Sequence, residues 1–229
     1  MCGRFALSAS RQAIADHFDL AETPELGARF NVAPGQAIAT ISVSAEERRS
    51  VLSTRRWGLV PSWAKDEKIG NRLINARAET VAEKPSFRSA LRRRRCLVPA
   101  DGFYEWAGTK GAKQPYFVGF EGRALFAFAG LWERWSDSEG EALESCTLLT
   151  TEATEPLSAL HDRMPVIVDP VDYGLWMDPD VVDPDLVSPV MDRGSARALD
   201  FHPISKHVND VRHDDPRCLE AVAGQSELF

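Results

Sequence analysis

Helical spacing of hydrophobic side chains is clearest in two parts of the chain. Residues 8–20 place Ile14 and Phe18 four positions apart, with a serine before the first turn that can cap it. Residues 84–95 place apolar side chains on one helical face, with Pro85 in the first turn. We predict a helix in each, and shorter helices in residues 152–160 and 169–177.

Short runs rich in β-branched, aromatic and other apolar residues predict strands. They cover residues 37–43, 50–57, 96–106 with an interruption at Asp101-Gly102, 114–120, 123–135, 145–151 and 163–168. We expect 37–43 to pair with 50–57, and 114–120 to form a hairpin with 123–135. A turn is predicted around Pro34-Gly35, and the pattern weakens beyond residue 178.

The many short strands show no βαβ rhythm, and no repeat or linker divides the chain. This arrangement predicts an α+β fold, mainly an antiparallel β sheet or partial barrel with several short helices around it. We expect a single domain over residues 1–229.

Composition is that of an ordinary soluble globular protein, with 44% hydrophobic and 27% charged residues. No stretch resembles a membrane span or a secretory signal, so we expect a cytoplasmic protein without membrane contact. The four cysteines are far apart and the five histidines form no metal-binding spacing. We therefore expect reduced thiols, no metal site and no cofactor.

Charge is distributed unevenly. The net charge is −7, yet residues 55–123 carry 15 basic and 7 acidic side chains, a local excess of +8. Interleaved aromatic residues make this stretch a candidate groove for single-stranded nucleic acid, in which rings stack on bases and cations follow the backbone. Most of these rings could equally belong to the core. Trp63, in a polar loop, is the ring least easily explained by burial.

Cys2 follows the initiator methionine, and its small side chain permits removal of Met1. The exposed residue would carry an α-amine beside a thiol, a pair that reacts readily with aldehydes. The alternative is an ordinary cysteine near a frayed terminus. Arg4, two residues later, would share a face with Cys2 in an extended segment, where a cation would lower the thiol pKa and could hold a phosphate.

Four further polar residues are candidates for a site. Asn75 and Arg77 would lie on one face of an extended segment and could hold a sugar-phosphate unit, although Asn75 could instead bond its own backbone in a turn. Glu105, between aromatic residues, would have a raised pKa suited to acid–base catalysis, or would point to solvent. His161 could shuttle protons or serve as a structural hydrogen-bonding residue.

Several sequence words together resemble the SRAP family, the SOS response-associated peptidase proteins. The match covers about the first three quarters of the chain, with a plausible continuation at "FHPISKHVNDVR". The words are "MCGRF", "FNVAPGQ", "WGLVPSWAKD", "INARAET", "CLVPADGFYEW", "LLTTEAT" and "LHDRMPVI".

The resemblance implies a sensor of abasic sites in single-stranded DNA that becomes covalently joined to the lesion. Matched residue by residue, Cys2 is the nucleophile exposed by loss of Met1, Asn75 positions the abasic sugar, Glu105 is the acid–base carboxylate and His161 is the active-site histidine. Arg4 and Arg77 match phosphate-contacting arginines. The loop of Trp63 resembles the family's wedge, although many relatives have two adjacent aromatic residues where this chain has Trp63-Ala64.

Chemistry consistent with this resemblance joins the Cys2 amine to the open-chain aldehyde as an imine, and the thiol then closes a thiazolidine that shields the lesion from strand cleavage. Two alternatives remain. A thiol peptidase, including self-cleavage before Cys2, would use Cys2, His161 and Asn75, and a binding module would hold single-stranded DNA without chemistry. We expect a monomer whose partner is single-stranded DNA with abasic sites, associated with the nucleoid when bound.

Overall fold

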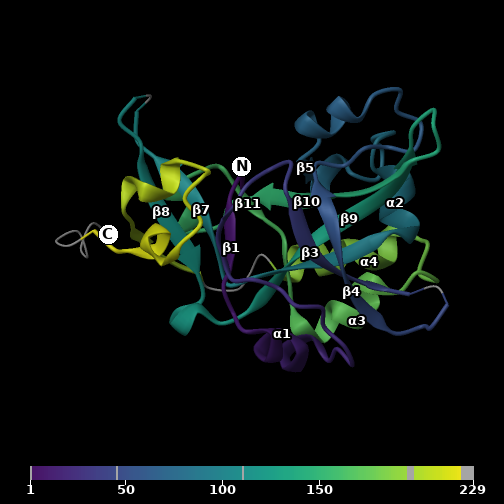
Figure 1. Ribbon diagram of the computed structural model, residues 1–229, viewed down its shortest axis with the longest axis horizontal. Coiled ribbons are helices and arrows are strands. Elements are labelled where there is room, and N and C mark those ends of the chain that lie inside the picture. The colour runs from purple at the N-terminus through teal and green to yellow at the C-terminus, as the bar shows by residue number, and fades with distance from the viewer. Residues whose placement is uncertain (1, 45, 110, 195–198, 223–229) are drawn as a thin grey trace.

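The computed structural model describes residues 2–44, 46–109, 111–194 and 199–222 (Figure 1). Its α-helices are α1 (Arg11–Phe18), α2 (Arg88–Arg93), α3 (Tyr173–Met177) and α4 (Pro184–Gly194). Helix α1 begins as predicted, because the Ser10 hydroxyl accepts a hydrogen bond from the Ala13 amide at 3.2 Å. Helix α2 is shorter than predicted and begins after Phe87, so Pro85 lies in the preceding turn. No helix of the described residues is long and apolar enough to cross a membrane.

Five strands close into a barrel, in the order β10-β4-β3-β6-β9 and back to β10. They are β3 (Ala37–Val43), β4 (Ser50–Trp57), β6 (Arg95–Ala100), β9 (Phe126–Ser136) and β10 (Ala142–Glu152). Every neighbouring pair is antiparallel except β4 with β10. Strands β5 (Asn75–Arg77) and β11 (Arg163–Pro165) pair with β10, and β12 (Ile167–Val168) pairs with β9. The predicted α+β class, with a mainly antiparallel sheet and barrel character, is confirmed.

A second sheet lies beside the barrel, in the order β13-β8-β7-β1-β2. Its strands are β1 (Phe5–Leu7), β2 (Arg29–Val32), β7 (Gly102–Ala107), β8 (Gln114–Gly119) and β13 (Asp200–Pro203). The expected hairpin of 114–120 with 123–135 is therefore wrong, because β8 belongs to this sheet and β9 to the barrel. Between them Gly122 and Arg123 both have positive φ, at 65° and 57°, and this turn carries the chain from one sheet to the other.

The interruption predicted at Asp101-Gly102 is real and marks a second crossing between the sheets. The buried Asp101 carboxylate accepts hydrogen bonds from the Ser8 amide at 2.6 Å, the Ser8 hydroxyl at 2.7 Å and the Ala9 amide at 3.1 Å. Gly102 is required by close packing, since a Cβ there would lie 1.9 Å from the Phe117 ring. These contacts place β1 against β7.

The hydrophobic residues form two clusters on opposite faces of the second sheet. The larger cluster fills the barrel and includes Cys2, Phe5 and Phe103. The smaller cluster consists of Ala6, Tyr104, Phe117, Ile204, Val208 and Cys218. Alternate residues of β1 and β7 thus face different clusters, as a strand's period of two requires. Figure 1 shows β1 between the barrel and the C-terminal segment, which lies beside β7 and β8.

Candidate active site

Cys2 lies three residues before β1, with its side chain fully buried against the larger cluster. The Tyr104 amide donates to the Arg4 carbonyl at 3.0 Å, which extends the β1–β7 pairing toward Cys2. The Asn75 amide Nδ2 donates to the Cys2 carbonyl oxygen at 2.8 Å. Residues 73 positions apart are therefore joined at the backbone of the candidate nucleophile.

Asn75 is the first residue of β5, which runs parallel to β10 with Asn75 opposite Leu148. This placement excludes the turn interpretation, since its amide donates to Cys2 and not to its own backbone. The Oδ1 atom is buried and accepts no hydrogen bond from the described residues. A buried amide oxygen without a donor is costly, so this atom is suited to a ligand hydroxyl or amine.

Glu105 lies on β7, on the same face as Phe103, and only 5% of it is exposed. Burial raises the pKa of its carboxyl above the usual value, and the charge of His161 partly opposes that rise. The alternative in which Glu105 points to solvent is therefore wrong. A carboxyl with a raised pKa keeps its proton to a higher pH than an ordinary carboxyl, which suits it to donate a proton and then to accept one.

The Cys2 thiol has a raised pKa, first because it is buried and second because of the nearby Glu105 charge. The predicted lowering of this pKa by Arg4 is wrong. The two side chains occupy different surroundings, since Cys2 packs in the larger cluster while the Arg4 guanidinium reaches Asn31 and Val208.

His161 lies in the loop between a short 3₁₀ turn (Leu157–Ala159) and β11. Its Nδ1 accepts a hydrogen bond from the Arg163 amide at 2.9 Å and lies 2.7 Å from the Asp162 carboxylate. The Arg163 guanidinium forms a two-pronged ion pair with Glu79, at 2.7 and 2.9 Å, which ties this loop to the chain just after β5. The contacts at Nδ1 therefore fix the orientation of the His161 ring within its own loop.

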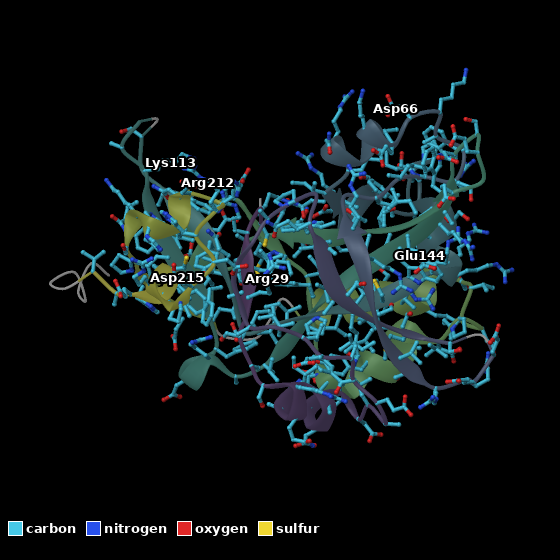
Figure 2. All side chains as sticks on the ribbon, viewed as in Figure 1. Arg29, Asp66, Lys113, Glu144, Arg212 and Asp215 are labelled. Atoms are coloured by element: carbon cyan, nitrogen blue, oxygen red, sulfur yellow. The ribbon has the colours of Figure 1, made fainter. Side chains whose placement is uncertain are left out.

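A groove of about 670 Å³ is lined in part by Gly3 and Arg4, the two residues that follow Cys2. Its lining is basic and aromatic, and consists of Gly3, Arg4, Trp106, Gly111, Lys113, Lys206 and Asn209. The Arg4 guanidinium lies 5.7 Å from the centre of the Trp106 ring. Figure 2 shows Lys113 at the end of the molecule that also carries the C-terminal segment. Lys206 and Asn209 escaped the sequence analysis because they lie outside the basic stretch, in a region without periodicity.

Arg4 differs from an ordinary surface arginine. Its Nη1 donates to Asn31 Oδ1 at 2.7 Å and to the Val208 carbonyl at 2.9 Å, whereas Nε and Nη2 make no hydrogen bond to the described residues. Burial lowers the pKa of this guanidinium from its usual value. A partly desolvated cation with neutral acceptors is well suited to an incoming anion.

Arg77 and Trp63 are both exposed, as binding residues must be. Arg77 ends β5, two residues from Asn75, and its side chain makes no hydrogen bond to the described residues. Trp63 is 58% exposed, in a loop whose Ala64 carbonyl accepts a hydrogen bond from Trp135 Nε1 at 2.7 Å. The loop therefore has a fixed base and an exposed ring.

Other members of the basic and aromatic stretch are structural. Arg95 is 3% exposed and donates to the carbonyls of Leu91 at 2.6 Å and Arg92 at 3.1 Å. Four of the aromatic rings are core residues, namely Trp57, Phe87, Phe103 and Tyr104. The basic stretch is thus only in part a ligand-binding surface. The described residues contain no cluster of three or more potential metal ligands.

Comparison with known proteins identifies the family of this chain. The family model described as SOS response associated peptidase (SRAP) matches residues 1–211, and the chain belongs to this family. "Abasic site processing protein YoqW" of Bacillus subtilis is 41% identical over 225 residues, covering 96% of this chain and all of that protein. "Abasic site processing protein HMCES" of Gallus gallus is 35% identical over 210 residues, covering 80% of this chain and 61% of that protein. A crystal structure of a Bacteroides thetaiotaomicron protein has the same fold, with a TM-score of 0.82, 24% identity and coverage of 96% and 100%.

Proposed function

We propose that this protein captures abasic sites in single-stranded DNA by forming a thiazolidine through Cys2 after removal of Met1. The observation that carries the proposal is the bond from the Asn75 amide to the Cys2 carbonyl, together with the buried Glu105, whose charge acts on the Cys2 thiol, and a basic groove lined by the next two residues, Gly3 and Arg4. The names of the similar proteins, which describe abasic site processing, support the same substrate.

The reaction begins with opening of the sugar hemiacetal. Glu105, with its raised pKa, can protonate the ring oxygen and remove the proton from the anomeric hydroxyl. The Cys2 α-amine then adds to the aldehyde carbon, and the resulting carbinolamine loses water to give an imine. The unpaired Asn75 Oδ1 is placed to accept a hydrogen bond from the amine or from a sugar hydroxyl.

The thiol acts second. Because burial raises its pKa, it is protonated in the resting protein and does not compete with the amine for the aldehyde. Its sulfur adds to the imine carbon while its proton is transferred to the imine nitrogen, directly or through Glu105 or His161. A five-membered thiazolidine results, and ring closure is favoured because both reacting groups belong to one residue. The adduct lacks the electrophile that drives β-elimination, so the DNA strand is not cut.

Substrate binding would use the groove and the exposed side chains around it. Arg4, Lys113 and Lys206 supply positive charge for phosphates, and Trp106 supplies a ring for a base. A single strand requires no base pair to be broken, so the sugar reaches Cys2 at a lower energetic cost than it would from a duplex.

The geometry supports this chemistry over thiol proteolysis. A cysteine peptidase needs a thiol with a lowered pKa and an amide that orients its histidine. Here burial raises the pKa of the Cys2 thiol, and the Asn75 amide donates to the Cys2 carbonyl.

The test is a denaturing gel of the protein mixed with single-stranded DNA carrying one abasic site. Wild type should give a band of retarded mobility that survives denaturation, and intact mass should show loss of Met1. Without a reductant Cys2→Ala should give none, and wild type with its α-amine acetylated should give none with or without borohydride. Cys2→Ser retains the amine but cannot form a thiazolidine, so it should give a band only after borohydride reduction. The proposal would be refuted if the protein with an acetylated α-amine still formed a crosslink, because the amine would then not be required.

A further inference from the structure

The C-terminal segment, residues 204–219, runs along the face of the second sheet that carries Tyr104 and Trp106 (Figure 1). It contributes the buried Ile204, Val208 and Cys218 to the smaller cluster, and its half-buried Leu219 packs against them. The family match ends at residue 211, so the last part of this segment lies beyond it. Even so, this segment supplies two residues to the groove, Lys206 and Asn209.

Asn31, at the centre of β2, is completely buried and joins this segment to the site. Its Nδ2 lies within hydrogen-bonding distance of three carbonyls, those of Val208 at 3.1 Å, Asp210 at 3.1 Å and His213 at 2.7 Å. Its Oδ1 accepts from Arg4 Nη1 at 2.7 Å. One amide thus binds the backbone of the C-terminal segment on one side and the guanidinium at the groove on the other.

Asp214, a residue of the C-terminal segment, in turn binds the backbone of β2. Its Oδ1 accepts hydrogen bonds from the backbone amides of Phe30 at 2.5 Å and Asn31 at 2.9 Å. Its Oδ2 forms an ion pair with Arg29 at 2.5 Å, and Figure 2 shows Arg29 between the barrel and the C-terminal segment. The segment therefore binds β2 through both the side chain and the backbone of Asn31.

The same segment also fixes the aromatic ring of the groove. Trp106 Nε1 donates to Asn209 Oδ1 at 2.8 Å. Arg4 and Trp106, which lie within cation–π distance of each other, are each bonded to this segment, Arg4 through the Val208 carbonyl and Asn31. The positions of Arg4 and Trp106 in the groove therefore both depend on the C-terminal segment.

We propose that Asn31 is a positioning residue that holds the Arg4 guanidinium toward the groove, with Asp214 fixing Asn31 in turn. Nη1 is occupied by Asn31 and Val208, which leaves Nε and Nη2 to a phosphate oxygen pair. The proposal rests on the proposed function in one respect, because it takes a DNA phosphate as the anion that Arg4 receives.

The first experiment measures Arg4 without DNA. Nitrogen-15 relaxation of the Arg4 Nε–H in the full chain should show a rigid guanidinium in wild type. Asn31→Ala should make it mobile on the nanosecond timescale, and Asp214→Asn should do so to a smaller degree. A guanidinium that stays equally rigid in folded Asn31→Ala would refute the positioning role, whatever the protein does with DNA.

The second experiment is a double-mutant cycle on binding of single-stranded DNA, with Cys2→Ala in every protein to prevent crosslinking. Asn31→Ala and Arg4→Gln should each weaken binding about tenfold, as expected for loss of a charged hydrogen bond. Each should reduce the slope of log K against log salt by about 0.7, the share of one phosphate on a single strand. The double variant should bind no more weakly than Arg4→Gln alone.

Arg77→Gln is the matched control, since Arg77 is an exposed arginine with no bond to Asn31. Its effect should add fully to that of Asn31→Ala. Full additivity between Asn31→Ala and Arg4→Gln would refute the proposal. If Asn31→Ala does not fold, the cycle with Asp214→Asn decides the question. Failure of wild type to bind single-stranded DNA would refute the proposed function, and the relaxation measurement would still test Asn31.

Discussion

The two faces of the second sheet are built by different interactions, although Cys2 and Arg4 are only two residues apart. On the barrel face, Cys2 and Glu105 are enclosed by an apolar core, and burial raises the pKa of both. On the other face, Arg4 is held by an amide and a carbonyl, and most contacts of the C-terminal segment are hydrogen bonds to backbone. For the proposed function, desolvation would set the proton affinities of Cys2 and Glu105 on the barrel face. On the other face, hydrogen bonds would orient Arg4 for binding a phosphate.

Among the changes considered, replacing Glu105 with Gln should have the largest effect, and it acts on the chemistry assigned to the barrel face. The rate of crosslinking at saturating DNA should fall about 1000-fold, because the variant cannot exchange a proton with the sugar. Affinity for DNA and its dependence on salt should be unchanged. The measurement is a single-turnover gel time course, with Glu121→Gln, an exposed carboxylate on the turn after β8, as the matched control. Equal rates for the two variants would contradict the assigned role.

Leu97→Ala tests how far the barrel determines overall stability. Leu97 is completely buried, on β6 of the barrel. The free energy of unfolding should fall by about 3 kcal/mol, through lost apolar burial and the cavity left behind. Leu186→Ala, at a position 58% exposed, should change it by less than about 0.5 kcal/mol. Urea titration followed by circular dichroism measures both, and similar values would contradict this account of the core.

Asp214→Ala tests the opposite face. Loss of two backbone hydrogen bonds and one ion pair should cost about 1.5 kcal/mol, concentrated at β2 and the C-terminal segment. Hydrogen exchange should accelerate at the Phe30 and Asn31 amides while barrel amides stay protected. Uniform acceleration across the barrel would show that the two faces unfold as one unit.

Glu105→Gln should also have a smaller effect, of opposite sign, on stability. The pKa of Glu105 is raised in the folded protein, so its ionised form is disfavoured there relative to the unfolded chain. The wild type therefore loses stability as pH rises above the ordinary carboxyl pKa. Glu105→Gln should be more stable than wild type near pH 7 and equally stable near pH 4. Thermal unfolding at both pH values tests this, and an unchanged difference between them would contradict the sign.

The sequence was informative where hydrophobic periodicity is strong. The Ile14–Phe18 spacing located α1, and the apolar runs located the barrel strands. Periodicity does not identify strand partners, so β8 and β9 were wrongly paired across a turn that in fact joins two sheets. Strand β2 was also missed, because the residues before the turn at Pro34-Gly35 were interpreted as part of that turn. Helix α4 was missed because it contains Pro189 and lies in a polar region.

The candidate site was predicted in part. Motif words located Cys2, Asn75, Glu105 and His161, and the structure brings Asn75 to Cys2 and the charge of His161 to Glu105. Their roles remain predictions. Asn31 and Asp214 could not be found, because each matters through contacts to backbone groups far away in the sequence. Lys206 was missed because it lies outside the basic stretch. The sign of the shift in the Cys2 pKa depends on burial, which a two-residue spacing does not reveal.

Burial of the Cys2 thiol has a consequence for how long the protein stays competent. In the proposed reaction the thiazolidine consumes its nucleophile, so each molecule would act once and would need to keep its sulfur intact until it meets a lesion. Oxidation to sulfenic acid and beyond proceeds through an exposed thiolate. A thiol that is fully enclosed and has a raised pKa offers neither exposure nor thiolate. The packing around Cys2 would thereby preserve the proposed nucleophile under the oxidising conditions that also damage DNA.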